Sequence, residues 1–180
     1  MRSGTELLTQ YAAYHRDRRN IATHFIGIPM IVLSLVILLS RPAIAVVDGV
    51  VVTPALILAV LSAAYYLWLD WRLGLGLIAF LIVCLALALP VAQAATAVWL
   101  VAGLGLFLVG WVFQFVGHYY EGRKPAFVDD LIGLLVGPLF VAAEAAFALG
   151  LRQELRRDIE RVVGPVVTRR TDAADVPSAH

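Results

Sequence analysis

Three of the four histidines stand beside other hydrogen-bonding residues in a chain that has few polar groups. His15 and His24 lie in the N-terminal stretch that leads into the first apolar segment, and His118 lies near the end of a long uncharged stretch. Neutral imidazoles are common ligands of first-row transition metals. We therefore predict that His15, His24 and His118 assemble a metal site, while the terminal His180 is set aside.

An amide and two acids have positions that could serve such a site. Asn20 precedes His24 by four residues, so the two share a helix face. Glu121 follows His118 by three residues, a spacing that lets one helix present two ligands or a ligand with its orienting acid. Glu144 stands among valine and alanine residues, where an acid is costly and usually faces the protein interior, although it could also be a surface acid of a shallow helix. We expect Asn20 and either Glu121 or Glu144 to complete or orient the coordination sphere.

The first two histidines can converge only if the chain bends between them. On one continuous helix, His15 and His24 are nine steps of about 100° apart and point in opposite directions. A break in the charged run 16–19, or one before Gly27 and Pro29, would bring them together.

The histidines and a neighbouring basic pair also have a second interpretation at a membrane surface. His15, His24 and His118 could be interfacial side chains that snorkel toward lipid headgroups. Arg123 and Lys124 follow the His118 segment and could anchor their loop to anionic lipids. The catalytic interpretation is that Arg123 or Lys124 recognises a substrate carboxylate.

The composition predicts a membrane protein. Of the 180 residues, 61% are hydrophobic and only 15% are charged, whereas soluble domains have about 25% charged residues. These values exclude a disordered chain and argue against a free-standing soluble globule. A net charge of +1 without a basic face gives no reason to expect nucleic acid as a partner. Cys84 lies in an apolar run and is interpreted as a small buried side chain.

The stretches without charged residues predict four membrane-spanning segments. Residues 73–120 contain no Asp, Glu, Lys or Arg and are long enough for two crossings, with a natural break at Leu89–Gln93 around Pro90. Two further apolar stretches precede them, the second with Pro54 as an early helical residue. The predicted spans are 25–40, 54–69, 73–90 and 95–116.

The basic residues orient these spans and decide how the remaining apolar segment is interpreted. They gather before His24, after Leu151 and at Arg123 and Lys124, so both termini and the 117–130 loop are expected on the cytoplasmic side. A fifth span would export the C-terminal tail. We therefore expect residues 128–150 to re-enter the membrane or lie at its surface as two short helices broken at Gly137-Pro138, with Asp129 and Asp130 as cap or first-turn acids.

The predicted fold class is all-α: a polytopic integral membrane helical bundle with about four spans plus a broken re-entrant or interfacial helix pair. We expect one membrane-embedded catalytic domain over residues 1–167, which ends in an amphipathic helix after Leu151, and a disordered tail over 168–180.

The polar clusters resemble a known family over about residues 5 to 150. The chain resembles the small polytopic membrane proteins related to the fungal 2-hydroxy fatty acid dioxygenase. Two distinctive motifs and a later group carry the resemblance: Tyr14-His15, Asn20 and His24-Phe25-Ile26-Gly27-Ile28-Pro29; Phe115-Val116-Gly117-His118, Glu121-Gly122 and Lys124-Pro125-Ala126; and Gly137-Pro138 with Glu144.

The resemblance implies an Fe(II)-dependent enzyme of fatty acid α-oxidation that shortens a 2-hydroxy fatty acid by one carbon with O2, in the breakdown of long-chain sphingoid bases. It places the metal-associated histidines at His15, His24 and His118. The residues suit this chemistry, because a 2-hydroxy acid can chelate a metal through two oxygens while a groove between apolar helices holds its tail.

Two other function classes compete with the enzyme. A small membrane carrier would use Glu144 and the histidines as a proton or metal relay, but residues 54–116 carry ionisable groups only at Asp70 and Arg72, apart from Tyr65, Tyr66 and Cys84. A non-catalytic membrane adaptor would recruit a partner through its charged tail and would tolerate loss of all three histidines.

Overall fold

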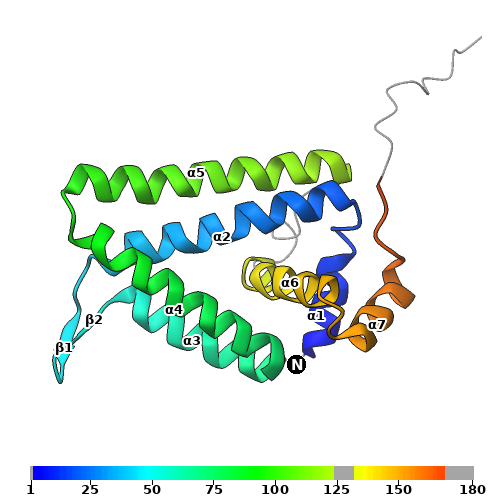
Figure 1. Cartoon of the computed structure of the whole chain (residues 1–180), viewed down its shortest axis with the longest axis horizontal. Helices are drawn as coiled ribbons and strands as arrows, with labels where there is room; N and C mark the ends of the chain where they lie inside the picture. The colour runs from blue at the N-terminus through cyan, green and yellow to red at the C-terminus, as the bar shows by residue number, and fades with distance from the viewer. Residues whose placement is uncertain (1, 124–131, 169–180) are drawn as a thin grey trace, which may run out of the picture.

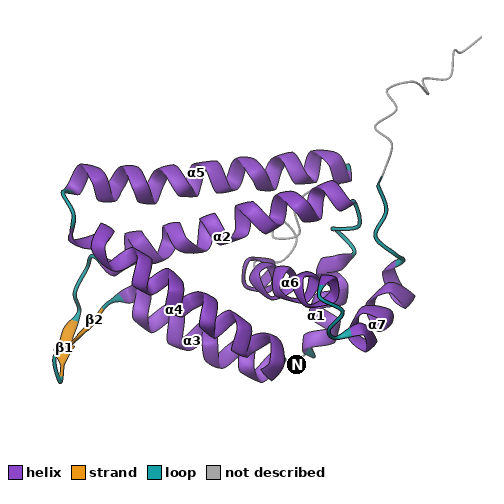
Figure 2. Cartoon of the chain, viewed as in Figure 1, coloured by secondary structure: helices purple, strands orange, loops and turns teal. Residues whose placement is uncertain are grey.

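The structure is a computed structural model that describes residues 2–123 and 132–168. Apart from one β-hairpin, the regular structure in this part of the chain is helical, which confirms the all-α part of the prediction (Figure 2). The elements in chain order are α1 (Gly4–Ala12), α2 (Arg18–Ser40), β1 (Ala45–Val47), β2 (Val50–Val52), α3 (Pro54–Leu69), α4 (Trp71–Gln93), α5 (Thr96–Glu121), α6 (Ile132–Ala148) and α7 (Gln153–Val163).

The helices form two antiparallel pairs and a cluster at one end. α2 and α5 run side by side, and α3 and α4 form the second pair, which crosses α2 (Figure 1). α1, α6 and α7 gather near the N-terminal end of α2, while the hairpin extends from the opposite end (Figure 1). This topology brings the start of α2, the end of α5 and one face of α6 together.

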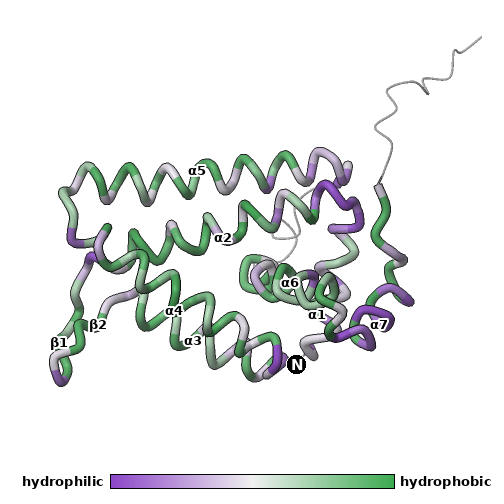
Figure 3. Tube along the Cα trace, in the orientation of Figure 1, coloured by the Kyte–Doolittle hydropathy of each residue, from purple (hydrophilic) through white to green (hydrophobic). Residues whose placement is uncertain are grey.

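Among the described residues, three helices are long and apolar enough to cross a membrane, namely α2, α4 and α5. α3 is apolar but shorter, and α6 and α7 pass the same test only as a pair that is bent by 114°. Each predicted span therefore coincides with one apolar helix, although α2 begins earlier, at Arg18, and α4 continues through Pro90 to Gln93. Apolar residues cover these helices, and polar residues concentrate on α7 and the turn before α2 (Figure 3).

Side-chain caps explain where α2, α3 and α4 begin, whereas α5 begins at Thr96 without one. Asp17 accepts a hydrogen bond from the backbone N–H of Arg19, and Thr53 accepts one from Leu56, directly before Pro54 in the first turn of α3. Asp70 ends α3 and caps α4, where its carboxylate accepts the backbone N–H groups of Arg72 and Leu73. One extended residue therefore separates two long helices.

The β-hairpin was not part of the sequence prediction. Asp48 and Gly49 have φ angles of 49° and 80°, the left-handed conformation that a two-residue type I′ turn requires at both positions. The turn joins Ala45–Val47 to Val50–Val52 in antiparallel register. An Asp-Gly pair between two valine-rich runs is the sequence signal for this hairpin.

The predicted break at Gly137-Pro138 is wrong. α6 is one helix from Ile132 to Ala148, and the chain bends after it, where Gly150 and Arg152 adopt positive φ angles of 77° and 54°. Proline displaces carbonyl groups of the preceding helical turn, but neighbouring helices can satisfy them. The carbonyl without its helical N–H partner is that of Leu134, and at the next carbonyl the Tyr66 hydroxyl of α3 donates to Leu135 at 2.9 Å.

The C-terminal part packs back onto the start of α2. The predicted amphipathic helix after Leu151 is α7, which buries Leu155 and Ile159. The guanidinium of Arg152, before α7, pairs with the Asp70 carboxylate. Val167 exchanges backbone hydrogen bonds with the 16–18 segment, from its N–H to the Arg16 carbonyl at 2.9 Å and from the Arg18 N–H to its own carbonyl at 2.8 Å. The predicted roles of Asp129 and Asp130 and of residues 169–180 lie outside the described residues.

Candidate metal centre

The structure brings the three predicted histidines together in the protein interior. His15 lies in the turn between α1 and α2, His24 on the second turn of α2 and His118 near the end of α5. Each offers one ring nitrogen such that the three atoms lie within 4.8 Å of one another. The exposed fractions of the side chains are 0%, 1% and 7%, so these histidines are not snorkelling toward a surface. The bend that this convergence requires is the turn before α2, whereas Gly27 and Pro29 lie inside α2.

The rings of His15 and His24 are held with their Nε2 atoms face to face. Nδ1 of His15 lies 2.7 Å from the Tyr11 carbonyl oxygen, and Nδ1 of His24 lies 2.9 Å from the Asn20 carbonyl oxygen. A carbonyl only accepts hydrogen bonds, so both Nδ1 atoms carry the proton in the neutral rings and both Nε2 atoms present lone pairs. The two Nε2 atoms are 3.1 Å apart. Two lone pairs at this distance repel unless a positive charge lies between or beside them.

A bound metal ion meets this requirement. Nitrogen ligands lie about 2.0–2.1 Å from a first-row ion such as zinc, so two of them at a right angle are about 3 Å apart. The Nε2 atoms of His15 and His24 have this separation. The backbone carbonyls that accept from Nδ1 correspond to the outer hydrogen bonds that usually fix the tautomer of a metal-bound histidine. The donor set therefore fits a transition-metal ion.

The surroundings keep His15 in the neutral form that a metal ligand needs. Burial lowers the pKa of His15 well below its ordinary value, and the nearby His24 imidazole lowers it further. The Tyr11 ring stacks on the His15 ring with centroids 4.1 Å apart and planes 6° from parallel. His15 is therefore uncharged at neutral pH and fixed in orientation by α1.

Glu121 ties the segment that bears His15 to the end of α5. Its Oε2 atom accepts hydrogen bonds from the backbone N–H of Arg16 at 2.9 Å and of Asp17 at 2.7 Å. It also accepts one from the Asn20 side-chain amide at 3.1 Å. The carboxylate is 1% exposed, so these three charge-assisted hydrogen bonds form without competition from water. Glu121 therefore positions the start of α2, and with it His15, relative to His118.

Small residues let α2 and α5 approach closely beside the histidines. A Cβ atom on Gly27 would lie 2.7 Å from the Gly110 carbonyl oxygen, and one on Gly117 would lie 2.2 Å from Thr23 Oγ1 and 2.4 Å from Asn20 Oδ1. Close backbone approach through small residues is the usual way in which helices pack in membranes. A Cβ atom on Gly103 would lie 2.4 Å from Leu38 Cδ2, whereas Gly105 faces open space.

Gly117→Ala is expected to destabilise the protein by about 1–3 kcal/mol through overpacking and to lower its metal content. The added methyl group would push α2 away from α5 at the level of Asn20 and His24. Thermal unfolding and elemental analysis in the same detergent measure both effects. Gly105→Ala on the same helix is the matched control, since nothing lies near its Cβ position. Equal stability of the two variants would contradict the role of this close approach.

Glu144 lies beside Arg16, and it does not belong to the group of three histidines that could hold a metal ion. Its carboxylate is 3.5 Å from the guanidinium of Arg16, whose Nε donates to the Ala12 and His15 carbonyls. Burial lowers the pKa of Arg16 while Glu144 opposes this effect. The negative charge of Glu144 thus compensates the buried positive charge of Arg16, next to His15. A direct contact between Glu144 and the metal remains a prediction.

Of the two basic residues predicted to bind the substrate carboxylate, Arg123 and Lys124, the structure describes only Arg123. Arg123 is exposed and donates a hydrogen bond of 2.9 Å to the Ala13 carbonyl, in the turn that leads to His15. Lys124 lies outside the described residues. Arg123 therefore reaches the same end of the molecule as the histidines.

A polar residue that the sequence analysis did not select faces the same site. A cavity of about 320 Å³ between α2, α5 and α6, which we call the histidine cavity, is lined by His24 and His118, by Gln114 and otherwise mainly by apolar residues. Gln114 is 6% exposed, and its side-chain N–H group has no hydrogen-bond partner in the described part of the chain. It precedes His118 by four residues, so the spacing that linked Asn20 to His24 could have identified it.

Comparisons with known proteins show the family to which the chain belongs. A family model described as "2-hydroxy-palmitic acid dioxygenase Mpo1-like" matches residues 1–149. The chain belongs to this Mpo1-like family. It is 34% identical over 154 residues to the protein named "2-hydroxy-palmitic acid dioxygenase MPO1" from Saccharomyces cerevisiae, and the alignment covers 83% of each chain. No solved structure matches the chain.

The family match confirms the resemblance that the two histidine motifs carry. It includes α1 to α6 and therefore every predicted site residue of this Mpo1-like chain. α7 and the segment at Val167 lie beyond the matched residues, although Val167 pairs with the backbone next to His15.

Proposed function

We propose that this protein is an Fe(II)-dependent dioxygenase that cleaves 2-hydroxy fatty acids to fatty acids one carbon shorter, with O2 as the second substrate. The observation that carries this proposal is the pair of buried Nε2 atoms that face each other at 3.1 Å, with His118 beside them, in a member of the Mpo1-like family. The name of the yeast relative supports the oxygenase class and the 2-hydroxy acid substrate.

The chain's own residues would hold and orient the reactants. His15, His24 and His118 would bind the iron, and the Tyr11 and Asn20 carbonyls would keep two of the rings in the required tautomer. When bound, iron(II) supplies the redox chemistry that couples dioxygen to cleavage of the bond between C1 and C2. The hydrogen bond between Glu121 and Asn20 would hold the histidine-bearing segments in position relative to one another. Glu144 would balance the charge of Arg16.

The histidine cavity provides the surroundings that an acyl substrate needs. Its apolar walls exclude water and would hold the carbons next to the carboxylate by burying them, at about 0.8 kcal/mol for each CH2 group. The Gln114 N–H group points toward a substrate oxygen in this proposal, and Arg123 or Lys124 would attract the carboxylate from the polar end of the molecule.

Membrane placement is part of the proposal. The three long apolar helices and α3 would form the spanning part, with lipids against their exposed apolar faces. The N-terminal stretch and α7 lie at the end of the molecule where α2 begins and α5 ends (Figure 1), and Arg123 donates a hydrogen bond to Ala13 at this end. By the positive-inside rule, both termini and the active site would then lie on the cytoplasmic side. The 168–180 tail would follow α7 on that side.

The experiment that tests the function combines metal analysis with product analysis. Protein purified anaerobically in detergent is expected to contain about one iron per chain and, after exposure to O2, to convert 2-hydroxypalmitate to the saturated fifteen-carbon acid. Mass spectrometry of the fatty acids and elemental analysis of the protein are the two measurements. Protein that contains iron but leaves 2-hydroxy acids of every chain length unchanged would contradict the proposal.

Gln114→Leu is expected to lower kcat/KM by about 10–100-fold while the iron content stays near that of the wild type. The substitution keeps the volume of the side chain but removes a donor to a charged or hydroxyl oxygen, which is worth about 1.5–3 kcal/mol. Gln93→Leu, at an exposed position at the end of α4, is the matched control. An unchanged kcat/KM in the Gln114 variant would exclude contact with the substrate.

A further inference from the structure

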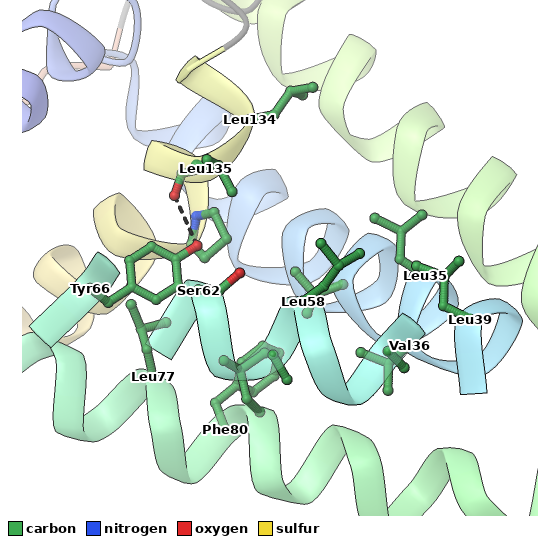
Figure 4. Close-up of a pocket in the computed structure, with 15 residues that line it drawn as sticks. Leu35, Val36, Leu39, Leu58, Ser62, Tyr66, Leu77, Phe80, Leu134 and Leu135 are labelled. Atoms are coloured by element: carbon green, nitrogen blue, oxygen red, sulfur yellow. Dashed lines mark hydrogen bonds between the residues drawn. The ribbon is translucent and has the colours of Figure 1, made fainter. Parts of the chain in front are cut away.

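A second apolar cavity adjoins the histidine cavity and shares four lining residues with it. This second cavity, which we call the α3 cavity, has a volume of about 230 Å³ and lies between α2, α3, α4 and α6 (Figure 4). Val32, Leu35, Leu134 and Pro138 line both cavities. The two cavities are therefore neighbours where α6 packs on α2, and their linings extend from His24 and His118 to α3. An acyl chain that occupies both requires that they join when it is bound.

One face of α2 lines both cavities, and we call the row of cavities along it the path. His24, Ile28, Val32, Leu35 and Leu39 are spaced so that they share one helix face, and each lines at least one of the two cavities. His24 stands at the metal centre and Leu39 at the far end. The fifteen-residue separation between them corresponds to about 22 Å at 1.5 Å per residue.

This length matches a long acyl chain. Carbon–carbon bonds of about 1.5 Å at about 111° advance an extended chain by about 1.25 Å per bond, so a sixteen-carbon acid spans about 19 Å. An acid with its head at the histidines would place its last carbons in the α3 cavity. The path has room for about two further carbons before Leu39.

Two small side chains of α3 line the α3 cavity. Ala55 and Ala59 are 2% and 8% exposed, and Val36 and Leu39 of α2 line the same cavity. The Tyr66 hydroxyl donates a hydrogen bond to the Leu135 carbonyl, and Ser62 supplies the other hydroxyl of the lining (Figure 4). The remaining lining side chains are apolar, so the cavity suits a saturated hydrocarbon.

We propose that the α3 cavity holds the distal half of the substrate's acyl chain and that Ala59 and Leu39 set the chain length that the enzyme accepts. This inference rests on the proposed function, since the histidine end must hold the carboxylate. A rival route exists between α2, α4 and α6, in a cavity of about 430 Å³ lined by Phe25, Gly76 and Ala145. It shares only Ile28 and Pro138 with the histidine cavity, and neither His24 nor His118 lines it.

The test compares 2-hydroxy acids of eight and sixteen carbons in binding to the detergent-purified protein and in turnover. Ala59→Phe is expected to reduce the ratio of kcat/KM for the long over the short acid by roughly 60-fold, because each of about three displaced CH2 groups is worth about fourfold. Ala59→Val is expected to give a smaller reduction in the same direction. Leu39→Ala is expected to shift the preference toward chains longer than sixteen carbons.

Two phenylalanine substitutions serve as controls. Ala64→Phe adds the same side chain to an exposed face of α3, and Ala145→Phe fills the rival cavity. An unchanged ratio in both Ala59 variants, or a reduced ratio in Ala145→Phe alone, overturns the inference. If the wild-type protein binds the long acid more tightly but converts neither acid, the proposed function fails while the chain-length path stands. If it converts both acids with equal kcat/KM and binds them equally, the path fails while the function stands.

Discussion

His24→Ala is expected to lose both the bound iron and the turnover of 2-hydroxypalmitate. His24 contributes one of the two Nε2 atoms that face each other at 3.1 Å, and its removal leaves two imidazoles of the cluster. Loss of an outer hydrogen-bond partner alone lowers metal affinity by about 10–100-fold, so loss of a direct ligand is expected to exceed 100-fold. Elemental analysis and single-turnover product formation, measured on the same preparation, give the two readouts.

The same experiment separates the three function classes. His180→Ala is the matched histidine substitution and is expected to keep both iron and turnover, because this residue stands outside the two motifs. Turnover retained in His24→Ala would reject the metal assignment. A variant that loses its metal while a cellular interaction persists unchanged would instead support the adaptor, and loss of proton or metal flux without any oxygenase activity in the wild type would support the carrier.

Glu121→Ala is expected to destabilise the protein by about 3–5 kcal/mol and to reduce its metal content. The substitution removes the acceptor for the Arg16 and Asp17 backbone N–H groups and for the Asn20 amide. Each buried donor left without a partner costs about 1–3 kcal/mol, and neighbouring losses are not fully additive. Thermal unfolding in detergent is expected to show a melting temperature lower by on the order of 10 °C.

Two further substitutions distinguish the role of Glu121. Glu121→Gln keeps an acceptor oxygen of the same reach and is expected to recover part of the stability and part of the iron. Glu154→Ala, an exposed acid in the first turn of α7, is the control and is expected to be close to neutral. A Glu121→Ala variant with wild-type stability and full iron content would show that the three hydrogen bonds do not position His15.

The sequence was sufficient for the helical class and the apolar helices. Long uncharged stretches with proline or acid caps at their edges correspond to α2 to α5, because helix formation in apolar surroundings depends on local hydrogen bonding and side-chain apolarity. The hairpin at Asp48-Gly49 carried a local signal as well, but the sequence analysis did not use it. α6 was misjudged because proline is tolerated inside apolar helices that pack against neighbours, and α2 and α4 also continue through a proline.

What the sequence by itself determined is the set of chemical groups: three histidines beside polar residues, one acid three residues after His118, and apolar helices on which to place them. Only the tertiary structure decided which atoms meet. The Nε2 contact between His15 and His24, the three hydrogen bonds of Glu121 and the path from Gln114 to Ala59 join residues on different helices. Such contacts depend on helix packing through Gly27 and Gly117, which local periodicity does not encode.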